Sequence, residues 1–487
     1  MSGEAATSRG AAFDRVAAVN VGLDRFAEAV RAQGSEAVDV DWRPPAGGDA
    51  EVVAQLQALW GRHGEQVDRA NAVVLERMEA TRPLARTVAR AGDVVPGLED
   101  GVLLHSGPPI EWARVCDPQR RALTAACVLE EWAEDREAAT ALLAGGQVRL
   151  APGNEHDHVG PMTGVCSPSM PVWVVDDEAS GARAFSTLNE GPGRTFWLGV
   201  ADDEAVERQR FLRDRAGPKL AALLERTGPV DVLSLAAQGL QMGDDLHMRS
   251  QATGNLLVRG LVAAFAAEGG EDVAAFIAGN HHFFLNLTMA AAKCASLAAA
   301  GEDGSTVVHL MARNGTDMGI QLAGLPGRWF TAPAAPVQDA LLREGFTEDD
   351  AAADIGDSAV IECIGLGGMA IAAAPAVATF FGGTAADAIA RTRLMAEICA
   401  GRSRRFTIPS MDYAPGPLGI DARLVAELQI TPQISTGVLH ATSGAGQIGA
   451  GVAHQPVEPF RAALAEVVRS LDAQAASSRI VPPTATA

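Results

Sequence analysis

The sequence predicts a multidomain α/β fold. The chain has 487 residues, which is enough for about two to four domains of ordinary size. Hydrophobic residues make up 48% of it, so a large buried core can form. Short apolar runs alternate along the chain with segments whose apolar residues recur at helical spacing, and this alternation indicates strands mixed with helices.

A β–α–β unit is the first element signal along the chain. Residues 16–21 form a short apolar run, residues 24–33 carry apolar side chains at helical spacing, and residues 38–42 alternate as VDVDW. Gly22 stands at the first strand-to-helix turn, and Gly34 stands where the helix would end.

More elements extend this unit, and we expect an open sheet with covering helices over residues 1–145. The expected elements are helices over residues 51–60, 66–90 (with a break at Pro83) and 119–144, and a strand over residues 102–104.

The remaining chain divides by composition into an α+β segment with a His-rich loop (146–205), a mainly helical domain (206–300), an α+β domain with Gly-rich loops (301–470) and a frayed tail (471–487). Strands over 170–177 and 182–193 predict one hairpin, and a turn at 313–316 predicts another. Residues 369–381 are the longest apolar run. Because a bilayer span needs about 20 residues, we expect a buried helix there.

Charge and cysteine usage narrow the function classes. The formal net charge is −21, which argues against nucleic acid and membrane partners because both select basic patches. The six cysteines show no metal-type spacing, and the N-terminus shows no signal peptide. We therefore expect a cytoplasmic protein that acts on a small molecule.

Two histidine motifs are candidates for proton transfer. In NEHDH, His156 and His158 would share one face of a strand and could bind zinc or supply a general base. The alternative is a polar loop whose histidines bond to the backbone. Asp244 and His247 are neighbours if they lie on a helix, and a carboxylate beside a histidine suits proton transfer. The alternative there is an exposed pair on a helix face.

Asparagines and a glutamate accompany a third histidine motif. In GNHHFF, at most one of the adjacent His281 and His282 can face a ligand, with Asn280 beside them. Asn189 and Glu190 end the second strand of the first hairpin. We expect Asn189, Glu190 and Asn280 to orient a substrate and His281 to contact it.

Two further motifs are candidates for binding an anion. Arg313, followed by Asn314 in an Asn-Gly turn, could grip a carboxylate or phosphate. The alternative is an ordinary hairpin with a solvated arginine. Gly365, Gly367 and Gly368 precede an apolar segment and could bring backbone N–H groups to an anion. A close helix–strand junction needs the same glycines. Asp357 and Glu362 upstream would be site members or caps, and His440 is the titratable group of the Gly-rich segment 435–451.

With these residues the chain resembles the YlbE/YahG-type family. The resemblance runs in order from about residue 13 to residue 465. It rests on VNVGLDRFAEAVRAQG, LLHSGPPIEW, HVGPMTGVCSPSMPVWVV, STLNEG, GNHHFFLNLTMAAAK, GSTVVHLMARNGTDMGI, RWFTAPAAPV, GDSAVIECIGLGGMAIAAAP and STGVLHATSGAGQIGAG.

The resemblance implies an α/β and α+β multidomain fold with a Rossmann-like N-terminal part, a small helical part and mixed α+β parts. It implies an oligomeric complex with an FdrA-type partner, a protein similar to acyl-CoA synthetases. Some family members are implied to be subunits of oxamate carbamoyltransferase, which makes oxalurate and phosphate from oxamate and carbamoyl phosphate.

The family tends to have a run of histidines where this chain has NEHDH. Leu246 and Met248 stand where it tends to have a small and a polar residue. If that stretch faces the substrate, we expect a more apolar pocket and an acceptor other than oxamate.

We therefore expect a carbamoyl or acyl transferase subunit that acts on a small amide or amine, with carbamoyl phosphate as co-substrate and no bound cofactor or metal. Gly365, Gly367, Gly368 and Arg313 would bind the phosphate, and His158 or the Asp244–His247 pair would take the proton. One alternative is a non-catalytic subunit that supports an FdrA-type partner. The other is a zinc-dependent amidohydrolase.

Overall fold

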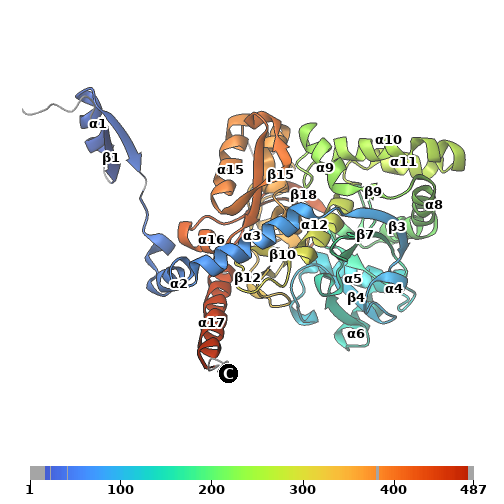
Figure 1. The fold of residues 1–487 in the computed structure, drawn as a ribbon. Coiled ribbons are helices and arrows are strands. Elements are labelled where there is room, and N and C mark those ends of the chain that lie inside the picture. Colours follow the sequence, from blue (N-terminus) through green and yellow to red (C-terminus); the bar gives the residue numbers. More distant parts are fainter. Residues whose placement is uncertain (1–16, 22–23, 41, 380–382, 481–487) are drawn as a thin grey trace, which may run out of the picture.

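The N-terminal β–α–β unit is present and stands apart from the remaining ribbon (Figure 1). In the computed structural model, which describes residues 17–21, 24–40, 42–379 and 383–480, β1 (Ala17–Val21) and β2 (Glu36–Val40) form a two-stranded parallel sheet joined by α1 (Asp24–Ala32). The turn expected at Gly22 lies outside the described residues. The β–α–β prediction is confirmed, and the Rossmann-like assignment stays a prediction.

The other strands within residues 1–145 do not join this sheet, so the single open sheet expected there is wrong. After α2 (Ala50–Trp60) and α3 (Gly64–Ala80), β3 (Leu84–Arg90) enters a sheet of order β8-β7-β3-β9, whose other strands are β7 (Pro171–Asp176), β8 (Arg183–Thr187) and β9 (Val230–Asp231). Residues 84–90 are thus a strand, not the end of a helix, because Pro83 closes the helical stretch and β3 pairs with the two strands β7 and β9, which leaves Ala85 and Val88 buried. The domain division stays a prediction.

The hairpin predicted over residues 170–193 is confirmed: β7 (Pro171–Asp176) pairs antiparallel with β8 (Arg183–Thr187), Val174 opposite Phe185. A second small sheet has the order β5-β4-β6, with β4 parallel to β5. Its strands and flanking helices are β4 (Val102–His105), β5 (Arg149–Pro152), β6 (Val165–Cys166), α4 (Ala91–Val94), α5 (Asp117–Leu129) and α6 (Arg136–Ala144).

The mainly helical stretch expected over residues 206–300 is also confirmed. It contains α7 (Asp203–Phe211), α8 (Gly217–Thr227), β9 (Val230–Asp231), α9 (Val232–Gln241), α10 (Gln251–Glu268), α11 (Glu271–Gly279) and α12 (Leu285–Ala299). Helix α12 lies in the middle of the molecule (Figure 1). Its residues 285–296 are all buried, since Ala and Ser side chains let neighbouring strands approach closely.

The C-terminal part contains three antiparallel sheets, with orders β12-β11-β10-β14, β13-β18-β17 and β15-β16. The predicted turn at 313–316 joins β10 to β11, with Arg313 opposite Met318. The strands are β10 (Val308–Asn314), β11 (Asp317–Leu322), β12 (Phe330–Pro333), β13 (Val337–Leu342), β14 (Ile355–Gly356), β15 (Cys399–Ile408), β16 (Ala414–Ile420), β17 (Gln433–Leu439) and β18 (Gln447–His454). The helices are α13 (Val360–Cys363), α14 (Pro375–Ala378), α15 (Ala385–Glu397), α16 (Ala422–Leu428) and α17 (Glu458–Ile480).

Two expectations fail in this part. The apolar run that starts at residue 369 is not one helix: a buried 3₁₀ segment, η7 (Gly367–Ala373), is followed by the short α14, because Pro375 cannot continue the hydrogen-bonding pattern of η7. The tail expected to fray from residue 471 is helical to residue 480 within α17. Leu471 is buried in the core there, and Asp472 pairs with Arg62 and His63.

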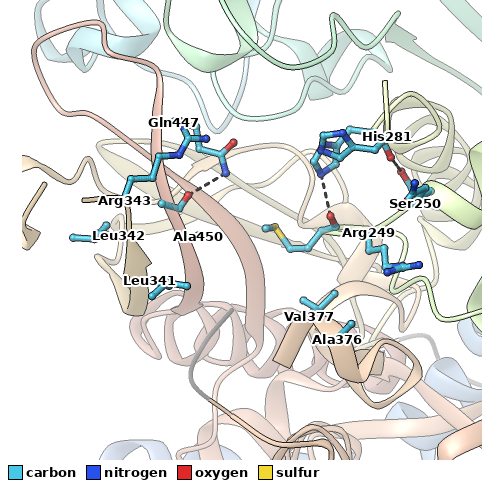
Figure 2. A pocket seen from close by; sticks show the side chains of 14 residues that line it. Arg249, Ser250, His281, Leu341, Leu342, Arg343, Ala376, Val377, Gln447 and Ala450 are labelled. Carbon is cyan, nitrogen blue, oxygen red and sulfur yellow. Dashed lines mark hydrogen bonds between the residues drawn. The ribbon is translucent and has the colours of Figure 1, made fainter. Parts of the chain in front are cut away.

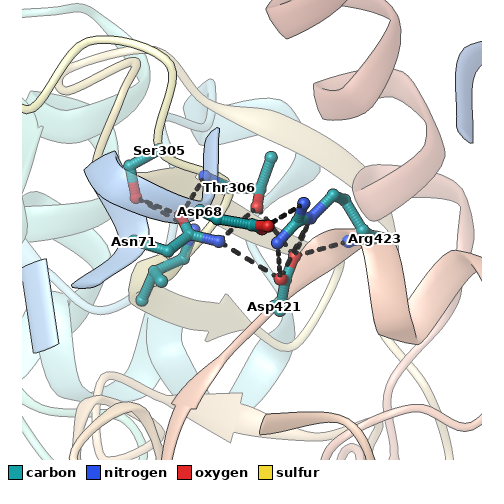
Figure 3. A network of polar contacts seen from close by, with 7 residues as sticks. Asp68, Asn71, Ser305, Thr306, Asp421 and Arg423 are labelled. Carbon is teal, nitrogen blue, oxygen red and sulfur yellow. Dashed lines mark hydrogen bonds and ion pairs between the residues drawn. The ribbon is translucent and has the colours of Figure 1, made fainter. Parts of the chain in front are cut away.

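A buried polar network ties the N-terminal helix α3 to the C-terminal sheets (Figure 3). Asn71 donates to Thr306 Oγ1 (2.9 Å) and Asp421 Oδ2 (3.2 Å), and accepts from Thr306 N and Ser305 Oγ. Arg423 pairs with the same Asp421 and stacks over Trp60. Segments more than 200 residues apart in sequence are therefore fixed to one another.

No helix in the described ranges is long and apolar enough to cross a membrane.

Candidate functional site

A cavity of about 600 Å³ opens between the loop before α10, the start of the α12 region and the sheet of β13 and β18. In Figure 2, Arg249, Ser250 and His281 form one wall, and Arg343 and Gln447 form the opposite wall. Its apolar lining comes from Met248, Leu341, Leu342, Ala376, Val377 and Ala450. A volume of this order suits a small-molecule ligand.

A small inner recess of about 30 Å³ adjoins the cavity. The two share Met248, His282 and Gln447 as lining residues, and the recess adds His247 and the hydroxyl-bearing Ser358 and Thr436. About one water-sized group fits in such a volume. The recess is therefore a place where one reacting group can meet His247.

His247 is held in one orientation by a buried carboxylate. Its Nδ1 lies 2.7 Å from Glu362 Oε1, which also accepts from Gly368 N at 2.9 Å. Because that oxygen already accepts an N–H, Nδ1 carries the proton, and Nε2 of the neutral ring keeps its lone pair. Nε2 has no hydrogen-bond partner among the described residues. This is the geometry of a general base.

The predicted pairing of Asp244 with His247 is wrong, because residues 242–250 are a loop and not a helix. Asp244 instead accepts from Ala252 N, Thr253 N and Thr253 Oγ1 at the start of α10. Asp245 accepts from the backbone N–H groups of His247 and Arg249, and burial raises the pKa of its carboxyl to about 6. Both aspartates shape the loop that presents His247.

The GNHH motif reaches the cavity through its histidines. His281 lines the cavity and its ring lies 4.3 Å from that of His282. His282 Nε2 donates to Met248 O (3.0 Å), and burial lowers the pKa of this imidazole to about 4. Both rings line the cavity, so the expectation that only one could face a ligand is wrong: the motif is a turn here, not a helix.

Asn189, Glu190 and Asn280 lie behind this wall and do not line either space. Asn280 donates to Asn189 O (3.0 Å) and accepts from His282 N. Glu190 accepts from Phe196 N and Trp197 N, and burial raises the pKa of its carboxyl to about 7. These residues hold His282 and Trp197 in place rather than contact a ligand.

The glycine run does not form an open anion cradle. Gly365 N donates to Glu362 O, Gly367 N to Asp245 O and Gly368 N to Glu362 Oε1, so all three amides are occupied. A Cβ at Gly367 would lie 2.2 Å from Glu362 Oε1 and 3.0 Å from His247 Cβ. The glycines thus allow the close approach that brings Glu362 to His247.

The expected anion grip at Arg313 and Asn314 is also wrong. Arg313 is fully buried, pairs with Asp354 through Nε (2.7 Å) and Nη2 (2.9 Å), and donates to Gly356 O. Asn314 donates to Pro108 O and accepts from Thr316 N and Asp317 N, which closes the turn. Neither residue lines the cavity.

The NEHDH histidines do not share one face or reach the cavity. His156 Nδ1 bonds to Pro96 O at 2.6 Å. His158 is buried elsewhere, its Nε2 has no partner among the described residues, and burial lowers its pKa to about 3. Within the described part of the chain, no three His, Cys, Asp or Glu side chains gather as a set that could hold a metal ion.

Two cationic residues that the motifs did not single out take the place expected for Arg313. Arg249 and Arg343 line the cavity from opposite walls (Figure 2). Arg249 Nε lies 3.3 Å from Asp244 Oδ1, and the Arg343 side chain makes no hydrogen bond or ion pair with any described residue. Arg343 follows an edge strand with no local motif, so only the pairing of β13 with β18 reveals its position.

The chain is similar to known proteins over most of its length. Residues 148–358 match the family model described as oxamate carbamoyltransferase subunit AllG. The uncharacterised protein YahG of Escherichia coli K12 is 36% identical over 92% of this chain and 96% of its own length. The oxamate carbamoyltransferase subunit AllG of the same organism is 39% identical over 83% of this chain and 98% of its own length. A crystal structure of a conserved protein of unknown function from Enterococcus faecalis V583 superposes with a TM-score of 0.82 at 35% identity, over 84% of this chain and 99% of that chain.

Proposed function

Since the chain belongs to the family of YahG and the oxamate carbamoyltransferase subunit AllG, we propose that it is a catalytic subunit of a carbamoyltransferase and that the cavity is its site. The observation that carries the proposal is His247: Glu362 holds its Nδ1, its Nε2 has no partner among the described residues, and it lines the recess that adjoins the cavity of the two arginines. The substrate class is a small amide or amine, with carbamoyl phosphate as the donor.

Charge supports this assignment. Carbamoyl phosphate is an anion, and a chain of net charge −21 needs local cations to hold it. Arg249 and Arg343 supply two guanidinium groups on opposite walls, suited to a phosphate and to a carboxylate on the acceptor. The nearby carboxylates of Glu362 and Asp245 line neither the cavity nor the recess. They accept hydrogen bonds from the loop that carries His247 and Arg249.

The chemistry follows from the position of His247. The acceptor nitrogen attacks the carbamoyl carbon, a C–N bond forms, and the C–O bond to phosphate breaks with its electron pair leaving on phosphate. His247 Nε2 takes the proton from the attacking nitrogen, and the imidazolium is stabilised by Glu362 across the 2.7 Å contact. That proton then passes to phosphate or solvent, so the base is regenerated.

An FdrA-type protein is the partner we propose, and the relative AllG carries the name of a subunit. The experiment is carbamoyl transfer by the full chain together with its partner, with phosphate release as the readout. His247→Ala is expected to lower kcat by about 100-fold or more, the usual contribution of a general base. Arg343→Met is expected to raise KM for carbamoyl phosphate with less effect on kcat.

His156→Ala is the matched control, because His156 bonds to Pro96 O away from the cavity. It should keep wild-type turnover. If His247→Ala turned over at the wild-type rate within the same complex, the chain would be a non-catalytic subunit and the catalytic assignment would be wrong.

A further inference from the structure

The apolar side of the cavity has no part in the proposed transfer, and it indicates what the acceptor looks like. In Figure 2, Leu341 lies below Arg343 on one side of the cavity, and Val377 and Ala376 lie below Arg249 on the other. Met248 lines both the cavity and the recess. The apolar side chains and both arginines therefore line the same cavity.

Size supports the same conclusion. Carbamoyl phosphate and oxamate together have about 14 non-hydrogen atoms, whereas cavities of several hundred Å³ accommodate drug-sized ligands. At about 600 Å³, the cavity leaves room beside the donor for an acceptor larger than oxamate. That room is lined by hydrocarbon, which cannot satisfy a polar group.

We propose that the acceptor is a carboxylate-bearing amide with a hydrocarbon segment, whose carboxylate pairs with an arginine and whose hydrocarbon lies against Met248, Leu341 and Val377. This inference rests on the proposed function for the identity of the reacting group, and on the lining of the cavity for the rest. Oxamate has the amide and carboxylate but no hydrocarbon to bury, so it would leave this wall in contact with water.

Binding to the full chain tests the proposal with oxamate, succinamate and adipamate as probes. All three have an amide at one end and a carboxylate at the other. Oxamate has no methylene groups between them, succinamate has a short run and adipamate has a longer run. Calorimetric titration is expected to show Kd falling along the series, by at least about tenfold from oxamate to adipamate, since a single methylene group buried in an apolar pocket already contributes about that factor. Met248→Asn and Leu341→Asn should each remove most of that gain. Leu341 is 59% exposed on an edge strand, so its variant keeps the fold.

Met242→Asn is the matched control, because Met242 is 57% exposed in the same loop region and lines neither space. It should leave the series unchanged. Equal affinity for oxamate and adipamate, or a gain that survives both Met248→Asn and Leu341→Asn, would overturn the inference. Carbamoyl transfer to oxamate alone would also overturn it while leaving the transferase assignment intact. A binding series as expected without any carbamoyl transfer would refute the proposed function and leave the apolar subsite standing.

Discussion

At the scale of single residues, the site depends on which partner each histidine finds. His247, His282 and His158 are all buried, yet only His247 meets a carboxylate. His282 donates to a carbonyl, and His158 Nε2 has no partner among the described residues. Burial without a carboxylate keeps the last two neutral, whereas the Nδ1 of His247 lies 2.7 Å from Glu362 Oε1.

His158 should make stability depend on pH. Its pKa is lowered by burial from 6.5 to about 3, so the unfolded chain binds the proton first as the pH falls below 6.5. The native state therefore loses up to about 1.4 kcal/mol of stability per pH unit below 6.5 through this residue. His158→Gln removes this loss, so the difference in unfolding free energy between wild type and variant should shrink steadily from pH 6.5 to pH 4.

Urea unfolding of both proteins at several pH values measures the effect. Above pH 7 His158 is neutral in both the folded and the unfolded chain. The difference in unfolding free energy between wild type and variant should therefore be constant there, which serves as the internal control. A difference that stayed constant down to pH 4 would contradict the buried, neutral state of His158.

At the scale of elements, the glycine run before η7 positions His247, the general base that we propose. Gly365 has φ 84°, and a Cβ there would lie 1.9 Å from Pro417 O, a backbone atom that cannot move aside. A Cβ at Gly368 would likewise lie 2.0 Å from Gln433 O. Strands β16 and β17 therefore approach this segment so closely that only glycine fits, and the approach fixes Glu362 beside His247.

Gly365→Ala should destabilise the protein by about 2–4 kcal/mol, because both the left-handed backbone and the contact with Pro417 oppose a side chain. Gly260→Ala in α10 is the matched control. Nothing lies within 4 Å of its added Cβ, so the change should stabilise the helix by about 0.5–1 kcal/mol. Thermal unfolding distinguishes the two, and equal melting temperatures for both variants would contradict the packing argument.

At the scale of the whole molecule, the chain is joined by polar contacts between distant segments. Asn71 on α3 bonds to Ser305, Thr306 and Asp421 (Figure 3). Each partner is buried, so removing the amide leaves several polar groups unsatisfied. This network connects α3 to the sheets that carry β10 and β16.

Asn71→Ala should therefore cost about 3 kcal/mol or more, beyond what a helix surface change costs. Val73→Ala on the same helix is 38% exposed before substitution and should change stability by less than about 0.5 kcal/mol. Chemical denaturation measures both. Similar midpoints for the two variants would show that the network adds nothing to the connection of α3 with the C-terminal part.

The sequence by itself determined the local elements, the family and the residue types of the site. The β–α–β unit, the 170–193 hairpin and the turn at 313–316 follow from side-chain periodicity and turn residues, which act within a few positions. Short histidine motifs predicted that His247 and His281 belong to the site. Only the tertiary structure decided their partners: Glu362 replaces Asp244 beside His247, and Arg249 and Arg343 replace Arg313 at the cavity. The physical reason is that charges pair through space across more than a hundred positions, as Glu362 does with His247, and no local pattern records that distance.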